Sequence, residues 1–295
     1  MFRTRQWKRA FAQADASSGY RGGTGTPLLL LHGVGGTWRV WLPVLSELER
    51  AHEVFVPTLP GHCGAEPLAK GAVPTIAALT DAVVDYLDRA GLDQVHVAGN
   101  SLGGWIALEL ARRGRARSVV VFGPAGAWRS ELRLKALATR LRLSFALLGR
   151  LSSRAETLAA RSLARKAVLG TQVAYPDRVD RVELAAAIRA VRHSPVVSPL
   201  LRTLADSPFE PLPDPGCPIR VVWAERDRVI PFRHYGGALL ERVPSAELVR
   251  LGGIGHVPMS DAPADVARLV QEVTSALDRD AAANDGVGDH EDGRR

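Results

Sequence analysis

Short apolar runs separated by stretches with helical spacing make up most of this chain. Residues 28–31 are four consecutive leucines, as expected of a strand buried on both faces of a sheet. Similar runs follow at residues 54–56, 95–98, 119–122, 219–223 and 247–249. Between them lie segments such as 75–90, whose apolar residues recur on one helical face. This alternation predicts an α/β fold with a mostly parallel central sheet and helices on both faces.

The alternation stops in the middle of the chain. Residues 125–215 are rich in Leu, Ala and Arg, have helical periodicity and show almost no strand signal. We therefore predict a helical lid inserted into a core made of residues 27–124 and 216–280. Residues 1–26 are basic and then rich in Ser and Gly, which indicates a flexible arm, and residues 281–295 contain few apolar side chains, which indicates a disordered tail.

Composition excludes several classes of protein. The net charge is +7, but the 38 basic residues are not grouped with aromatic side chains or a docking motif, so no nucleic-acid partner is expected. Two cysteines are too few for a disulfide framework, which favours a reducing, cytoplasmic location. No apolar run reaches the roughly 18 residues of a membrane span. The basic N-terminus is not followed by an apolar signal-peptide segment.

A nucleophile motif occurs between the third run and the helix after it. Residues 99–103 read Gly-Asn-Ser-Leu-Gly, the G-x-S-x-G pattern of a nucleophile elbow. A tight turn from strand to helix holds its central residue in a strained conformation, and the flanking glycines avoid collisions with neighbouring elements. The hydroxyl of Ser101 would therefore stand above the sheet at a helix N-terminus, where the dipole favours negative charge.

Acyl transfer also needs donors for a tetrahedral oxyanion. We expect the backbone N–H of Leu102 to be one donor and that of Val34 to be the other. Val34 lies in a Gly-rich loop, residues 32–36, and Gly33 and Gly35 would let the backbone of this loop approach the substrate. His32 ends the preceding strand and is interpreted as a residue that braces the loop by hydrogen bonds to backbone.

A serine nucleophile needs a base and a third group that orients the base. Asp227 lies just beyond the run 219–223, and His256 lies in a Gly-rich segment after the last run. Both therefore follow carboxyl ends of strands, on the sheet edge where Ser101 is expected. Glu225 is an alternative acid, and we favour Asp227 because Glu225 sits closer to the strand.

Together these segments resemble the α/β-hydrolase superfamily, within the group of cap-bearing serine esterases, carbon–carbon bond hydrolases and cofactor-free haloperoxidases. The resemblance spans roughly residues 27–124 and 216–280, and it implies a catalytic triad of Ser101, Asp227 and His256 without a metal or organic cofactor. A Ser nucleophile, in place of Asp, argues against dehalogenases and epoxide hydrolases. Thr58 departs from the family pattern, because Asp is common at that position.

The expected reaction is hydrolysis of carboxylic esters of hydrophobic acyl substrates through an acyl-enzyme. The residues expected to contact this small molecule are Gly33, Gly35, Asn100 and Trp128. Apolar residues between Leu132 and Leu148 would cover an apolar pocket. The ten basic residues between Arg129 and Lys166 either form a solvated face or attract carboxylate substrates or an anionic membrane surface.

Two other functions remain open at this stage. A carbon–carbon bond hydrolase of vinylogous diketo acids would share the Gly-Asn-Ser elbow and would use basic lid residues for a carboxylate. A ligand-binding homologue that has lost catalysis would not need all three members of the triad. The sequence leaves the oligomeric state open.

Overall fold

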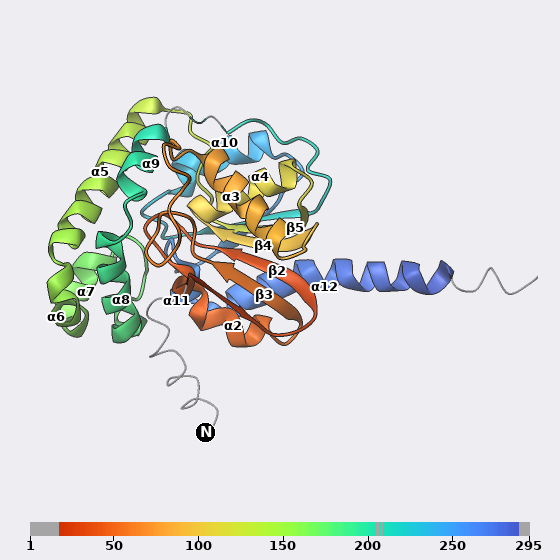
Figure 1. Cartoon of the computed structure of the whole chain (residues 1–295), viewed down its shortest axis with the longest axis horizontal. Coiled ribbons are helices and arrows are strands. Elements are labelled where there is room, and N and C mark those ends of the chain that lie inside the picture. Colours follow the sequence, from red (N-terminus) through yellow and green to blue (C-terminus); the bar gives the residue numbers. More distant parts are fainter. Residues whose placement is uncertain (1–17, 205–206, 208, 289–295) are drawn as a thin grey trace, which may run out of the picture.

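The computed structural model describes residues 18–204, 207 and 209–288. Its centre is a seven-stranded sheet in the order β1-β3-β2-β4-β5-β6-β7, in which only β1 runs antiparallel to its neighbour (Figure 1). The strands are β1 (Gly19–Gly22), β2 (Thr26–Leu31), β3 (His52–Pro57), β4 (Val95–Asn100), β5 (Ala116–Phe122), β6 (Ile219–Ala224) and β7 (Glu247–Leu251). The predicted α/β fold with a mostly parallel sheet is confirmed.

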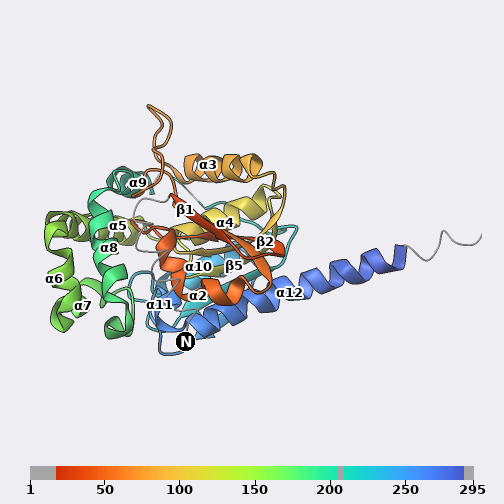
Figure 2. The same cartoon turned by 60° about the horizontal axis from the view of Figure 1, so that its bottom comes forward.

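Helices cover both faces of the sheet (Figure 2). Because side chains alternate along a strand, Leu29 and Leu31 pack on one side, while Leu28 and Leu30 pack on the other. The first side is covered by α3 (Ile76–Arg89), α4 (Leu102–Arg112) and α10 (Phe232–Arg242); the second is covered by η1 (Trp38–Trp41), α2 (Leu42–Leu48), α11 (Pro258–Asp261) and α12 (Pro263–Gly288). The four leucines are fully buried, which explains why residues 28–31 contain no polar side chain.

A helical insertion separates β5 from β6 and lies beside the carboxyl ends of the strands (Figure 1). It contains α5 (Glu131–Arg150), η2 (Ser152–Arg154), α6 (Ala155–Ala160), α7 (Ser162–Leu169), η3 (Pro176–Arg178), α8 (Arg181–Arg192) and α9 (Val197–Thr203). Helices α6 and α8 form a small core of their own around Ala159 and Ile188. This insertion agrees with the predicted helical lid.

Helix α5 is less buried than its many leucines suggest. Leu134 and Leu137 are buried against the core, but Leu132, Leu143 and Leu147 are exposed. A helix on a domain surface buries only one stripe, so its outer apolar residues face solvent whatever their number. Part of the apolar surface expected to cover a pocket therefore covers nothing within the described residues.

The ends of the described chain differ from the sequence expectation. Residues 19–22, assigned to a flexible arm, form β1 and pair with β3; two glycines in four residues had hidden this short strand, since Gly has low β-propensity. Helix α12 continues to Gly288, beyond the predicted start of the tail at residue 281, where three consecutive alanines favour helix. The rest of the predicted arm (1–17) and tail (289–295) lies outside the described residues.

Within the described residues, none of the helices combines the length and apolar character needed to cross a membrane. In the same part of the chain, Cys63 and Cys217 are not joined in a disulfide.

Candidate active site

Ser101 occupies the sharp turn between β4 and α4. Its backbone has φ 56° and ψ −114°, and no other non-glycine residue in the described part of the chain has a positive φ. A Cβ on Gly99 would lie 2.3 Å from the carbonyl oxygen of Gly103, and one on Gly103 would lie 2.3 Å from that of Leu31. Only glycine fits at either position, so the pattern in the sequence reflects a packing requirement around a strained residue.

Asp227 and His256 are directly bonded. Nδ1 of His256 lies 2.7 Å from Oδ2 of Asp227, and both side chains are buried. The second oxygen, Oδ1, accepts hydrogen bonds from the backbone N–H groups of Val229 at 2.9 Å and Ile230 at 2.7 Å. Because the carboxylate accepts, the imidazole carries its proton on Nδ1 when neutral. Its Nε2 then has a free lone pair.

Glu225, the alternative acid, has a different partner. Its Oε2 accepts a hydrogen bond of 2.9 Å from the backbone N–H of Gly253, and the residue is exposed. The two acids that the sequence left in competition are thus separated by orientation. Asp227 points inward to the imidazole of His256. Glu225 instead binds the backbone of the loop that precedes His256.

Asn100 joins the turn of Ser101 to the loop of His256. Its Nδ2 donates hydrogen bonds of 2.9 Å to the carbonyl oxygens of Phe122 and His256, and its side chain is buried. Gly123 lies against the Asp227–His256 pair. A Cβ on Gly123 would lie 2.9 Å from Oδ2 of Asp227 and 3.2 Å from Nδ1 of His256. Asn100, expected among the substrate-binding residues, has its amide hydrogens directed to backbone carbonyls.

The Gly-rich loop after β2 reaches Ser101. A Cβ on Gly33 would lie 3.3 Å from Cβ of Ser101. Gly35 has φ +73°, and a Cβ there would lie 2.5 Å from the ring of Phe145 on α5. The side chain of Val34, between these glycines, is half-buried against the core. The loop is therefore enclosed between the serine and the lid.

His32 braces this loop, as predicted. Its Nε2 accepts a hydrogen bond of 2.8 Å from the backbone N–H of Leu59, so Nδ1 carries the proton and donates to the carbonyl oxygen of Gly33 at 2.8 Å. Complete burial, together with repulsion from His62, lowers the pKa of His32 to about 3. The imidazole is neutral at physiological pH, which suits a structural role.

Trp128, the last expected substrate contact, lies just before α5. Its ring packs edge-to-face against Trp105 at 6.4 Å and Tyr235 at 5.2 Å between centroids. Its Nε1 is buried and has no hydrogen-bond partner within the described residues. An unpaired buried donor of this kind costs free energy unless another group satisfies it.

One segment of the lid, residues 170–176 (the lid strap), is bonded to both loops that follow β6 and β7. Arg228 donates a hydrogen bond of 3.0 Å from Nη1 to the carbonyl oxygen of Gly170, and the N–H of Val257 donates to that of Gln172 at 2.9 Å. The strap thus holds the two segments that carry Asp227 and His256.

Asp261 is the acid that the sequence analysis missed. Its carboxylate is buried and accepts three backbone N–H groups: Oδ2 accepts from Ala174 and Gly255, both at 2.8 Å, and Oδ1 accepts from Tyr175 at 3.0 Å. Two of these donors belong to the lid strap, and the third directly precedes His256. The only signal in the sequence was a lone acid at the end of the segment 251–261, which contains no other acidic residue.

The described residues contain no group of three or more His, Cys, Asp or Glu side chains placed to hold a metal ion. They place a strained serine, a buried carboxylate–imidazole pair and a Gly-rich loop at the carboxyl edge of one sheet. Such an arrangement suits nucleophilic catalysis at an acyl carbon.

Comparison with known proteins shows what the chain is similar to. The model of the alpha/beta hydrolase family matches residues 28–269. Over 203 residues the chain is 36% identical to epoxide hydrolase EphH of Mycobacterium tuberculosis, covering 66% of this chain and 92% of the relative. It is also 31% identical over 252 residues to a pimeloyl-(acyl-carrier protein) methyl ester esterase of Aromatoleum aromaticum, covering 83% and 97%.

Solved structures share the fold. A meta-cleavage product hydrolase of Pseudomonas fluorescens superimposes with a TM-score of 0.67 over 88% of this chain and 93% of that chain. At 19% identity this likeness extends to the architecture alone.

Proposed function

Because the chain belongs to the alpha/beta hydrolase family, we propose that it is a serine hydrolase that cleaves carboxylic esters of hydrophobic acyl substrates through an acyl-enzyme. The observation that carries the proposal is the buried contact of 2.7 Å between Nδ1 of His256 and Oδ2 of Asp227. The loop of His256 is bonded to Asn100, the residue that precedes Ser101. A serine hydroxyl becomes a useful nucleophile when such an oriented base accepts its proton.

In the proposed mechanism, Ser101 attacks the acyl carbonyl while Nε2 of His256 takes the hydroxyl proton. Asp227 keeps the Nδ1 proton in place and stabilises the imidazolium that forms, because both of its oxygens are already oriented by hydrogen bonds. His256 then protonates the leaving alkoxide. Water, deprotonated by the same imidazole, releases the acid and restores Ser101.

The backbone N–H groups of Leu102 and Val34 are the proposed oxyanion donors. Leu102 begins α4, so its N–H is one of the helix's unpaired first-turn donors, and the dipole of α4 favours negative charge there. Gly33 allows the loop of Val34 to approach within contact of Ser101. One donor of this type is worth about 3 kcal/mol of transition-state stabilisation.

The proposed preference for apolar acyl groups rests on apolar side chains of this loop and of the lid. Phe145 of α5 touches Gly35, and Val34, Leu141 and Trp128 are half-buried against the same core. Apolar and aromatic walls with a few placed polar groups are the usual lining of small-molecule sites. A hydrophobic acyl chain would pack against these apolar side chains.

One relative of this chain is an epoxide hydrolase, which raises the question whether this chain also opens epoxides. The serine at position 101 argues against that reaction. Attack of a serine oxygen on an epoxide carbon would form an ether, which has no carbonyl at which water could release the enzyme. A carboxylate nucleophile would form an ester, which water can hydrolyse. Because position 101 is Ser, acyl transfer is the chemistry that permits turnover.

A carbon–carbon bond hydrolase of vinylogous diketo acids is the second candidate. The observation that favours it is the pair Arg226 and Arg228, which flank Asp227 in the chain and line a cavity together with Lys166. Such a substrate carries a carboxylate, whereas a neutral ester does not.

We also propose a reducing, cytoplasmic location, in keeping with two cysteines that form no disulfide within the described residues.

The test is labelling with a fluorophosphonate, followed by hydrolysis of p-nitrophenyl esters of increasing acyl length beside a diketo-acid substrate. Ser101→Ala should lose both label and turnover. The control is Ser144→Ala, which changes an exposed serine on α5 and should keep both.

Asp227→Asn should lower kcat by about 10⁴-fold, while Glu225→Gln should leave kcat within a few-fold of wild type. Labelling or turnover by Ser101→Ala would overturn the proposal, and faster cleavage of the diketo acid than of any ester would favour the second candidate.

A further inference from the structure

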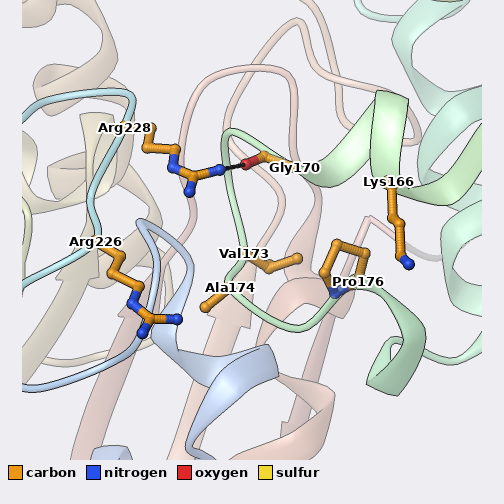
Figure 3. A pocket seen from close by; sticks show the side chains of 7 residues that line it. All are labelled: Lys166, Gly170, Val173, Ala174, Pro176, Arg226 and Arg228. Carbon is orange, nitrogen blue, oxygen red and sulfur yellow. Dashed lines mark hydrogen bonds between the residues drawn. The ribbon is translucent and has the colours of Figure 1, made fainter.

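A cavity of about 290 Å³ opens between the lid strap and the loop that carries Asp227 (Figure 3). Lys166 and the strap line one side, and Arg226 and Arg228 line the other. The volume lies near the lower end of the ~300–1,000 Å³ range of ligand sites, so it suits a small group rather than a whole lipid or peptide.

All the charged side chains that line this cavity are cations. Lys166, Arg226 and Arg228 contribute three positive charges, and the remaining lining residues are uncharged. The nearby acids are engaged elsewhere. The carboxylate of Asp227 is bonded to His256 and to backbone N–H groups, and Glu225 is bonded to Gly253.

The donors of these cations are largely unused. Arg226 has no side-chain hydrogen bond or ion pair within the described residues, and Arg228 has one, to the carbonyl oxygen of Gly170. Within the described residues, Lys166 has one ion pair, with Asp177 at 3.9 Å, and both side chains of that pair are more than half exposed. An exposed pair at this separation contributes little, so it does not neutralise the cavity.

We propose that this cavity is an anion site that binds a carboxylate or phosphate group. A guanidinium presents a planar fork of N–H donors that matches either group, and Lys166 adds a point charge from the opposite wall. A bound anion would offset the mutual repulsion of the three cations. It would also bridge the lid to the Asp227 loop, because Lys166 belongs to α7 and the two arginines belong to the segment after β6.

Two sources could supply the anion: a free small anion, or a charged end of the substrate itself. The second source rests on the proposed function, whereas the first does not. The experiment therefore has one arm without turnover and one arm with it.

In the first arm, inorganic phosphate is titrated at constant ionic strength and its Kd is measured by calorimetry. Arg226→Gln removes an unpaired, exposed side chain and should not disturb folding. Arg142→Gln on α5 is the matched control, because it removes the same charge from an exposed position of the lid outside the cavity. If a free anion binds here, Arg226→Gln weakens phosphate about tenfold, the loss of one charge-assisted hydrogen bond, and Arg142→Gln leaves Kd unchanged.

In the second arm, KM is compared for a p-nitrophenyl half-ester of a dicarboxylic acid and for a neutral p-nitrophenyl ester of equal chain length. If the substrate supplies the anion, Arg226→Gln raises KM for the half-ester about tenfold and leaves KM for the neutral ester unchanged. The proposal is overturned if Arg226→Gln changes neither the phosphate Kd nor the ratio of the two KM values, or if Arg142→Gln has the same effect. Failure of both esters to react would count against the proposed function and would leave the phosphate arm to decide this site.

Discussion

Asn100 donates a hydrogen bond of 2.9 Å from Nδ2 to the backbone carbonyl oxygen of His256, 156 residues further along the chain. The same amide nitrogen donates to the carbonyl oxygen of Phe122, at the end of β5. Asn100 therefore ties the loop that carries His256 to the end of β5 and to the turn of Ser101. We propose that its role is to position His256 relative to Ser101.

Asn100→Ala should lower kcat about tenfold or more while KM changes little, because the base is displaced and apolar substrate contacts remain. Two buried carbonyl oxygens lose a donor, so the free energy of unfolding should fall by about 1–3 kcal/mol. Steady-state kinetics and urea unfolding measure the two effects. Ser118→Ala is the control, since Ser118 bonds His96 near the start of β5; it should lower stability without lowering kcat, and an equal loss of kcat would contradict the positioning role.

The carboxylate of Asp261 couples the lid strap to the residue before His256. Asp261→Asn leaves one acceptor oxygen and places an N–H₂ group against a backbone donor, so the free energy of unfolding should fall by about 1–3 kcal/mol. We expect kcat/KM to fall as well, because both the strap and the histidine loop lose an anchor. Denaturant unfolding and ester hydrolysis provide the measurements.

Asp180→Asn is the matched control for that variant. Asp180 also accepts two backbone N–H groups, from Val182 and Glu183, but it caps α8 on the exposed side of the lid. It should cost about 1 kcal/mol or less and leave kcat/KM unchanged. If the two variants lose the same activity, Asp261 has no special connection to the site.

Gly35 and Phe145 should show strong energetic coupling. Gly35→Ala introduces a Cβ 2.5 Å from the phenyl ring and requires a positive φ, so it should disturb both the loop of Val34 and the position of α5. In a Phe145→Ala background the collision disappears and only the backbone strain of about 1 kcal/mol remains. A double-mutant cycle on unfolding free energy and on kcat tests this, and additive effects would mean that the loop and α5 are not in contact.

Two buried histidines predict a loss of stability in acid. Burial lowers the pKa of His62 to about 4 and that of His32 to about 3, so the folded state resists protonation that the unfolded chain accepts below its ordinary value of 6.5. Their contribution to stability is therefore complete above about pH 6.5 and is lost as the pH falls toward 4. Each histidine adds a slope of up to about 1.4 kcal/mol per pH unit in this window.

His62→Gln removes one of these slopes. Urea unfolding between pH 7 and pH 4.5 should show a shallower fall of unfolding free energy than in the wild type, by about 1 kcal/mol per pH unit. His193→Gln, at an exposed position of the lid, should keep the wild-type slope. A slope that is the same in all three proteins would show that other groups account for the acid sensitivity.

Much of the fold could be read from local pattern, and the failures have physical causes. The leucine run 28–31 predicted a strand because both faces of that strand are covered. The strand of residues 19–22 was missed because its stability comes from pairing with β3, which a single segment does not reveal. The exposed Leu132, Leu143 and Leu147 were misjudged because composition counts apolar residues but does not say which of them face solvent.

The sequence by itself determined the turn around Ser101, because the steric demands of a strained residue between two glycines are local and leave a local pattern. Only the tertiary structure decided which acid meets His256, since Glu225 and Asp227 are two residues apart and differ in direction rather than in chemistry. It likewise revealed the hydrogen bonds by which Asp261 holds the lid strap, and the cavity that Lys166 and Arg226 both line. Such sites are formed by the packing of distant segments against each other, and no short stretch of sequence records that packing.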